Sequence, residues 1–274
     1  IIDRLGDLTS NFEEVGAYIR NFMNREMGGT KILLVVCDND NSMFGRFYYP
    51  LELKPMSYLD CKGFHPNYTS MQQLQAFAMV GGTPAYHHLI GDTDPEEVIR
   101  TQMFDHMSVF SLEVEGMISS EVLAFDGCTK VLAAMARGAE STREISARTQ
   151  LASSYCSKLV DDMEHKGILQ KEVSSGISRR SVYSMNSNIL RFYYQVVYRY
   201  THMVEFESSS GAYEAARGDI TAYMERGFKA VCMEYVTQKY DYRFIGKLRR
   251  KDDTVDTVID FVASVMIDGR ARTI

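Results

Sequence analysis

A chain of 274 residues is longer than a single hydrophobic core usually supports, so we expect two or three compact units. Hydrophobic residues make up 45% and charged residues 24% of the sequence, a composition that excludes a disordered or fibrous protein. The net charge of -6 repels polyanions on average, which excludes a general electrostatic basis for binding nucleic acid.

The longest apolar run, ILLVVC at residues 32–37, is far shorter than the roughly 20 residues of a membrane-spanning helix, so we expect no membrane partner. The chain begins at Ile1 without a basic and then apolar leader, which indicates a cytoplasmic protein and a fragment of a longer chain. The five cysteines are an odd number and form no C-x-x-C pair, as expected of reduced thiols.

Residues 1–40 predict a βαβ unit. The opening IID predicts the end of a strand, and residues 11–26 predict an amphipathic helix. KILLVVC, at residues 31–37, predicts a strand that is buried on both faces of a parallel sheet. Asp38 follows this strand, at the carboxyl end where open parallel sheets bind their ligands.

From residue 69 to about residue 116 the pattern is helical, with two interruptions. In GDTDPEEV, Asp94 can cap a helix whose first position is Pro95. In GGTPAYHHLI, residues 81–90, glycine allows the backbone to approach a ligand closely, and Pro84 offers a stiff apolar face to a flat ring. The same letters also fit a Gly-Pro break between two helices that binds nothing.

Residues 119–187 predict three helices and a β-hairpin, the order of a winged helix-turn-helix. We expect the helices in TKVLAAMARG, STREISARTQ and SSYCSKLVDDMEHKG, with Ser141 or Thr142 as the cap of the second helix. ILQKEVSSGISRRSVYSM predicts the hairpin around a Ser-Ser-Gly turn. Residues 188–274 predict two helices followed by strands, the last two joined by an Asp-Gly turn.

In this order, the stretches resemble the archaeal-type ATPases, P-loop proteins of the AAA+/STAND group that carry a winged helix and a restriction-endonuclease-like tail. The resemblance rests on IID, KILLVVCDNDNSM, PLELKPMSYLD, GGTPAY, LRFYY, FKAVCMEY and IGKLRR with VIDFV. It implies a mixed α/β and α fold in four parts. These are the C-terminal part of a P-loop core (1–57), a helical lid (58–118), a winged helix-turn-helix (119–187) and an incomplete α/β restriction-endonuclease-like domain (188–274).

The resemblance also implies a nucleotide site. Gly82, Thr83 and Pro84 match the G-x-P turn of the lid, which in this group lies over the adenine. Asp3 matches the Walker B aspartate, a catalytic residue and metal ligand. Arg4 stands where a glutamate usually follows, so either the hydrolytic base lies elsewhere or turnover is slow.

Two further catalytic candidates follow the second predicted strand. Asp38 could meet Mg²⁺ or the γ-phosphate, or it could be an ordinary loop aspartate. Arg46, in MFGRFYYP, matches a possible charge-stabilising arginine, although it could equally be a surface arginine whose stem packs on Tyr48 or Tyr49. No phosphate-binding G-x-x-x-x-G-K-[ST] loop occurs in the 274 residues. We therefore expect ATP and Mg²⁺ to bind only the full-length protein, and this chain alone to be inactive.

The last two parts carry weaker candidates. Asp260 and Glu234 could belong to a nuclease-like metal site, which we expect to be inactive because the E-x-K motif would fall beyond the last residue. Arg179 and Arg180 of the wing could hold a DNA backbone. The recognition helix, however, carries more acidic than basic residues, which also fits a protein partner.

Two hypotheses of different classes follow. In the first, the chain is the C-terminal part of an ATP-binding ATPase whose nucleotide state repositions the winged helix and the tail. In the alternative, it is a non-enzymatic DNA-binding or protein-interaction module with vestigial ATPase and nuclease-like parts.

Overall fold

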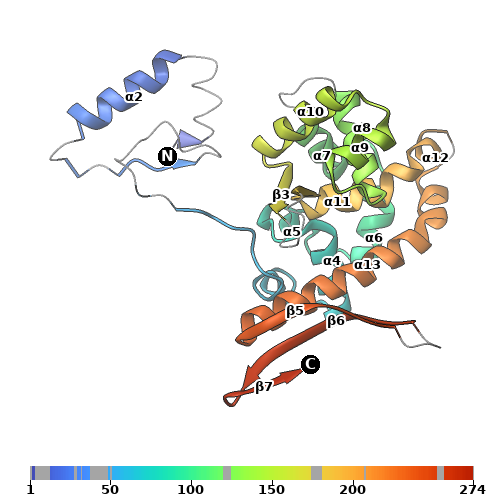
Figure 1. Ribbon diagram of the computed structural model, residues 1–274. Coiled ribbons are helices and arrows are strands. Elements are labelled where there is room, and N and C mark those ends of the chain that lie inside the picture. Colours follow the sequence, from blue (N-terminus) through green and yellow to red (C-terminus); the bar gives the residue numbers. More distant parts are fainter. Residues whose placement is uncertain are drawn as a thin grey trace. The chain divides into compact units, whose positions relative to one another are not determined.

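The computed structural model describes residues 2–3, 13–27, 30–31, 33–37, 49, 51–119, 125–173, 181–206, 208–251 and 256–273 (Figure 1). The chain divides into two compact units, Ile1–Lys54 and Pro55–Ile274. This division lies between residues 54 and 55, and the boundary predicted after residue 57 remains a prediction. The lid, winged-helix and tail segments all lie within the second unit, and the boundaries predicted between them remain predictions.

The first unit contains a small parallel βαβ arrangement. Its elements are β1 (Ile2–Asp3), α2 (Glu13–Arg25) and β2 (Val36–Cys37). Ile2 pairs with Val36 and Asp3 with Cys37 in the parallel register, which confirms the predicted strand, helix and strand. The expectation of a long strand buried on both faces is wrong for the described residues, because Leu33 is 85% exposed and nothing described covers it.

The second unit begins with a series of short helices. They are α3 (Tyr58–Cys61), η2 (Lys62–Phe64), α4 (Ser70–Val80), α5 (Pro84–Ile90), α6 (Pro95–Val98), the π-helical turn η3 (Ile99–Met103) and α7 (Val109–Ser119). Capping residues that can be recognised in the sequence begin several of these helices. The Thr69 side chain accepts from the Gln72 amide at the start of α4, and Asp94 caps α6 with Pro95 at its first turn, as predicted.

Three helices and a hairpin come next, in the predicted order. They are α8 (Phe125–Ala136), α9 (Thr142–Thr149), α10 (Ser153–His165), β3 (Leu169–Val173) and β4 (Ser181–Met185). Ser141 caps α9 and forms a capping box with Glu144. β3 and β4 are antiparallel, with Leu169 opposite Met185 and Val173 opposite Ser181. We call residues 125–185 the helix–hairpin segment.

The remaining elements are helices followed by antiparallel strands. They are α11 (Asn188–Gln195), η4 (Val197–Tyr200), α12 (Thr201–Phe206), α13 (Ser209–Lys239), β5 (Tyr242–Lys251), β6 (Asp256–Ile267) and β7 (Arg270–Thr273). The strands form one sheet in the order β5-β6-β7. Asp268 and Gly269 have φ of 51° and 73°, so the predicted Asp-Gly turn between the last two strands is confirmed.

One hydrophobic core runs through the helices of the second unit. Its largest fully buried side chains include Met79 of α4, Phe110 of α7, Leu132 of α8, Leu159 of α10 and Phe192 of α11. A second, small cluster of Val236, Ala263 and Val265 joins the sheet to the C-terminal end of α13. Figure 1 shows β5 and β6 beside this helix. Because these helices share a core, the helices from α4 to α7 and the helix–hairpin segment are parts of one packed body.

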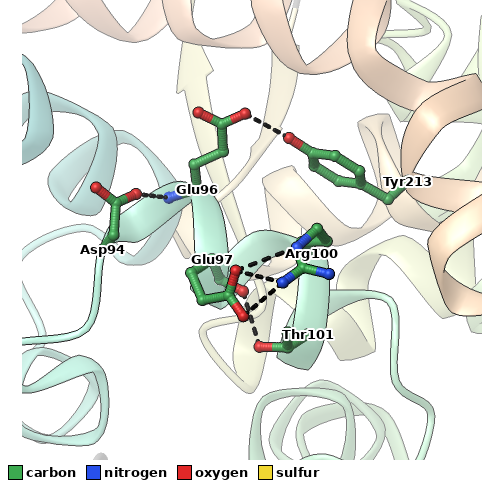
Figure 2. Close-up of polar contacts among 6 residues, drawn as sticks. All are labelled: Asp94, Glu96, Glu97, Arg100, Thr101 and Tyr213. Atoms are coloured by element: carbon green, nitrogen blue, oxygen red, sulfur yellow. Dashed lines mark hydrogen bonds and ion pairs between the residues drawn. The ribbon is translucent and has the colours of Figure 1, made fainter.

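The long helix α13 packs closely on α4. A Cβ atom on Gly227 would lie 2.5 Å from Cβ of Ala78, so glycine is what permits this approach. A polar contact joins α13 to α6 as well: the Tyr213 hydroxyl donates to Glu96 Oε1 at 2.6 Å. Figure 2 shows Glu96 reaching from α6 toward Tyr213. In the same turn, Arg100 pairs with Glu97 at 2.6 Å.

Candidate functional site

The turn at residues 81–84 joins α4 to α5, and two glycines make it possible. Gly81 has a positive φ of 70°, a conformation that strains residues with a Cβ atom. Gly82 lies against the backbone of Met56: the Met56 amide donates to the Gly82 carbonyl at 2.9 Å, and a Cβ on Gly82 would come within 2.0 Å of the Met56 oxygen. Both glycines are buried. The close approach that Gly82 permits is therefore to Met56.

The exposed part of the turn lies after the glycines. Thr83 is the N-cap residue of α5, but its side chain makes no capping hydrogen bond, and Pro84 occupies the first turn of the helix. Thr83 is partly exposed and Pro84 is exposed. Of the three residues expected to meet adenine, Thr83 and Pro84 can present their side chains to a ligand, whereas Gly82 supports them from behind.

The C-terminal end of α4, just before the turn, is held from two other elements. Asn188, the first residue of α11, donates through Nδ2 to the Phe77 carbonyl at 3.1 Å and to the Ala78 carbonyl at 3.4 Å. The Tyr223 hydroxyl of α13 lies 3.1 Å from the Ala78 carbonyl and 3.3 Å from the Asn188 carbonyl. Asn188 is the third residue after the helix–hairpin segment, so the end of that segment is connected through a short stretch of chain to the start of the turn.

A buried pair of histidines fixes the other side of the turn. His87 Nε2 lies 2.8 Å from the Gly81 carbonyl, His87 Nδ1 lies 2.9 Å from His65 Nε2, and His65 Nδ1 lies 3.0 Å from the Gly91 carbonyl. Both side chains are 1% exposed. The pair therefore links the Gly81 and Gly91 turns at the two ends of α5.

These three contacts require three N–H groups, but two neutral imidazoles supply one each. A fully hydrogen-bonded pair would carry one extra proton. Burial opposes that proton and lowers the pKa of both His65 and His87, while the hydrogen bonds to the Gly91 and Gly81 carbonyls partly offset the effect. We assign the pair as neutral at pH 7. The neighbouring His88 is exposed, and its ring and that of Phe64 meet edge to face, with centroids 5.1 Å apart.

The other predicted site residues are described only in part. Asp3 lies in β1 of the first unit, where it pairs with Cys37 of β2. Asp38, Arg46, Arg179 and Arg180 lie outside the described residues. The roles of all five residues remain predictions.

The two nuclease-like candidates occupy different elements. Asp260 is a residue of β6, and Glu234 is a residue of α13. Glu234 Oε1 accepts from the Tyr58 amide at 2.7 Å, at the exposed first turn of α3. The described contacts of Glu234 therefore give it a structural role as a helix cap. Among the residues that the structure describes, no three His, Cys, Asp or Glu side chains gather closely enough to hold a metal ion.

Asn188 and Tyr223 are site-supporting residues that the sequence pattern did not indicate. Asn188 contacts a carbonyl 111 positions earlier in the chain, and Tyr223 contacts one 145 positions earlier. No local motif marks such contacts. The only signal in the sequence was the position of Asn188 at the predicted start of a helix, where asparagine is common.

In the described part of the chain, no helix combines the length and apolar character needed to cross a membrane. Neither a known protein family, nor a curated protein, nor a solved structure matches this sequence.

Proposed function

We propose that this chain is the C-terminal part of a P-loop ATPase of the AAA+/STAND type, in which the turn at residues 81–84 covers the adenine of a bound nucleotide. The observation that carries the proposal is the construction of the turn. Its glycine backbone is buried and fixed by Met56, Asn188 and the histidine pair, while Pro84 is left exposed. A rigid apolar face of this kind suits a flat aromatic ring.

The same contacts support a coupling between nucleotide and winged helix. Asn188, three residues after the helix–hairpin segment, donates to the end of α4, and the hydrophobic core is continuous from α4 to α13. If the turn moves when a nucleotide binds, the helix–hairpin segment should therefore move with it, because both belong to one packed body. In this proposal the helix–hairpin segment acts as a winged helix that reports the nucleotide state.

Phosphate binding needs more than these 274 residues, because they contain no G-x-x-x-x-G-K-[ST] loop. The proposal gives Asp3 the role of Mg²⁺ ligand and Asp38 and Arg46 catalytic roles at the phosphates. ATP hydrolysis is proposed for the full-length protein alone.

The test compares two prolines that each occupy the first turn of a helix. Pro84 of α5 is exposed, whereas Pro95 of α6 is buried. In the full-length protein, Pro84→Ala should weaken the binding of labelled ATP about fivefold, the loss of roughly 1 kcal/mol of ring contact. Pro95→Ala should leave the affinity unchanged. Equal affinity in Pro84→Ala and the wild type, or no binding of ATP by the full-length protein, would refute the proposal.

A second candidate is a non-enzymatic interaction module that binds a protein through the helix–hairpin segment. The charge of α10 favours it: the helix carries Lys158 against Asp161, Asp162 and Glu164, and both Lys158 and Asp161 are exposed. Such a surface repels phosphate. This candidate would be favoured over the first if duplex DNA failed to bind at low salt, and if the addition of ATP did not change that lack of DNA binding.

A further inference from the structure

A cavity of about 440 Å³ lies between the helix–hairpin segment and the helices α11 and α13, away from the 81–84 turn. Three arginines line it: Arg191 of α11, Arg199 of η4 and Arg226 of α13. We propose that this cavity binds a small organic anion, a carboxylate or phosphate joined to a compact apolar group. The proposal is independent of the nucleotide site.

The guanidinium groups of Arg191 and Arg226 have N–H donors beyond those used in their described hydrogen bonds. In the described contacts, Arg191 uses Nε for the Met185 carbonyl at 3.2 Å, and Arg226 uses one terminal nitrogen for Gln195 Oε1 at 3.2 Å. Each guanidinium carries further N–H groups in a planar fork that matches two oxygens of a carboxylate or phosphate. Arg191 and Arg226 can therefore bind an oxyanion without giving up these contacts.

The acidic side chains of the cavity do not neutralise these groups. Asp219 is already held by Arg199 at 2.6 Å and by the Tyr200 hydroxyl at 2.8 Å. Arg191 and Arg226 form no ion pair with any carboxylate among the described residues. With Arg199 and Asp219 paired, two cationic groups face the cavity against the carboxylate of Glu140, which leaves an excess of positive charge.

Arg191 and Arg226 line the same cavity from two different helices, α11 and α13. The Arg226 guanidinium carbon is 5.7 Å from the centroid of the Tyr223 ring of its own helix. An anion in the cavity can therefore meet fork-shaped donors from both helices.

The remainder of the lining explains why the ligand is small and partly apolar. Met135, Ala139, Met185 and Ala222 contribute to the wall. A volume of this size falls in the range of small-molecule sites, which combine apolar walls with a few fixed polar groups. The phosphates of a DNA duplex stay on a polar surface and would gain nothing from the methionines. A ring or short hydrocarbon attached to an oxyanion uses both parts of the cavity.

The experiment measures the binding of three probes by titration calorimetry at fixed ionic strength: phenyl phosphate, benzoate and inorganic phosphate. We expect phenyl phosphate or benzoate to bind more tightly than inorganic phosphate, and the tighter of the two identifies the preferred oxyanion. Arg226→Gln, an exposed position, should weaken binding about tenfold or more, as the loss of charged hydrogen bonds implies. Arg191→Lys keeps the charge but removes the fork and should weaken binding as well.

Arg217→Gln is the matched control, because Arg217 is an exposed arginine on the same helix that pairs with Glu214 at 3.4 Å outside this cavity. It should leave probe binding unchanged. Three results would overturn the proposal: none of the probes binds, Arg217→Gln weakens binding as much as Arg226→Gln, or duplex DNA binds more tightly than every probe and loses affinity in Arg226→Gln. Melting curves of each variant establish that a loss of binding is not a loss of fold.

Discussion

Two glycines of α13 provide a direct test of how this helix packs. Both Gly218 and Gly227 lie inside the helix, where alanine is the better helix former. A Cβ atom on Gly218 would meet nothing within 4 Å, whereas one on Gly227 would lie 2.5 Å from Cβ of Ala78 on α4. The same substitution, glycine to alanine, therefore has different consequences at the two positions.

The magnitude follows from this geometry. Gly218→Ala should stabilise the protein by about 0.5–1 kcal/mol through helix propensity alone. Gly227→Ala receives the same benefit, but carbon atoms normally approach to about 3.5–4 Å, so α13 and α4 must separate by about 1 Å. Such overpacking costs about 1–3 kcal/mol. Since the propensity effect is common to both variants, the free energies of unfolding should differ by about 1–3 kcal/mol.

Thermal unfolding followed by circular dichroism measures this difference. For a unit of this size, about 1–3 kcal/mol corresponds to a difference in Tm of roughly 2–12 °C, with Gly227→Ala the lower. Urea unfolding at one temperature gives an independent value of the same free energy. If Gly227→Ala were as stable as Gly218→Ala, α13 would not approach α4 as closely as the structure shows.

Three further predictions concern contacts around the turn and α6. Burial lowers the pKa of His65 and His87 in the folded protein below the value in the unfolded protein. As the pH falls through about 6.5, the unfolded protein therefore binds more protons than the folded protein does. The urea midpoint should consequently decrease from pH 7.5 to pH 5.5. His87→Gln should make this decrease shallower and the exposed His88→Gln should not; equal slopes in both variants would contradict the assignment. Asn188→Ala removes the side-chain donor to two α4 carbonyls and should lower the free energy of unfolding by about 1–3 kcal/mol in urea titrations, and a change within error would show that these contacts are not important. Tyr213→Phe removes the hydroxyl that donates to an exposed glutamate of α6 and should cost about 0.5–1.5 kcal/mol in the same assay, with a much larger loss pointing to disrupted packing instead.

Local chemistry explains which elements could be predicted from the sequence. The caps at Ser141 and Asp94 involve partners two or three residues away, so their motifs are visible in a short window, and the structure confirms both. The Asp-Gly turn between β6 and β7 is likewise a local signal. The helix expected in ITAYMERGFKAVCMEYVTQ covers only the second part of α13, which begins at Ser209 after its cap Ser208.

Contacts between distant residues explain what could not be predicted. The apolar run before Cys37 indicated a covered strand, but coverage depends on neighbouring elements, and Leu33 is exposed. For the candidate site, the letters GGTP indicated a special turn. They gave no sign that Gly82 would contact Met56, or that Asn188 would hold the preceding helix, because such contacts form only when the chain is folded.

The continuous core from α4 to α13 also limits how this protein could be cut or exchanged in evolution. A break after residue 187 would remove Phe192 and Tyr223, and the preceding helices would lose the core contacts that these side chains provide. If recombination replaced the helix–hairpin segment alone, the new segment would have to pack against the helices that precede it and the helices that follow it. An exchange with another protein would more readily carry the whole stretch from Pro55 onward as one unit.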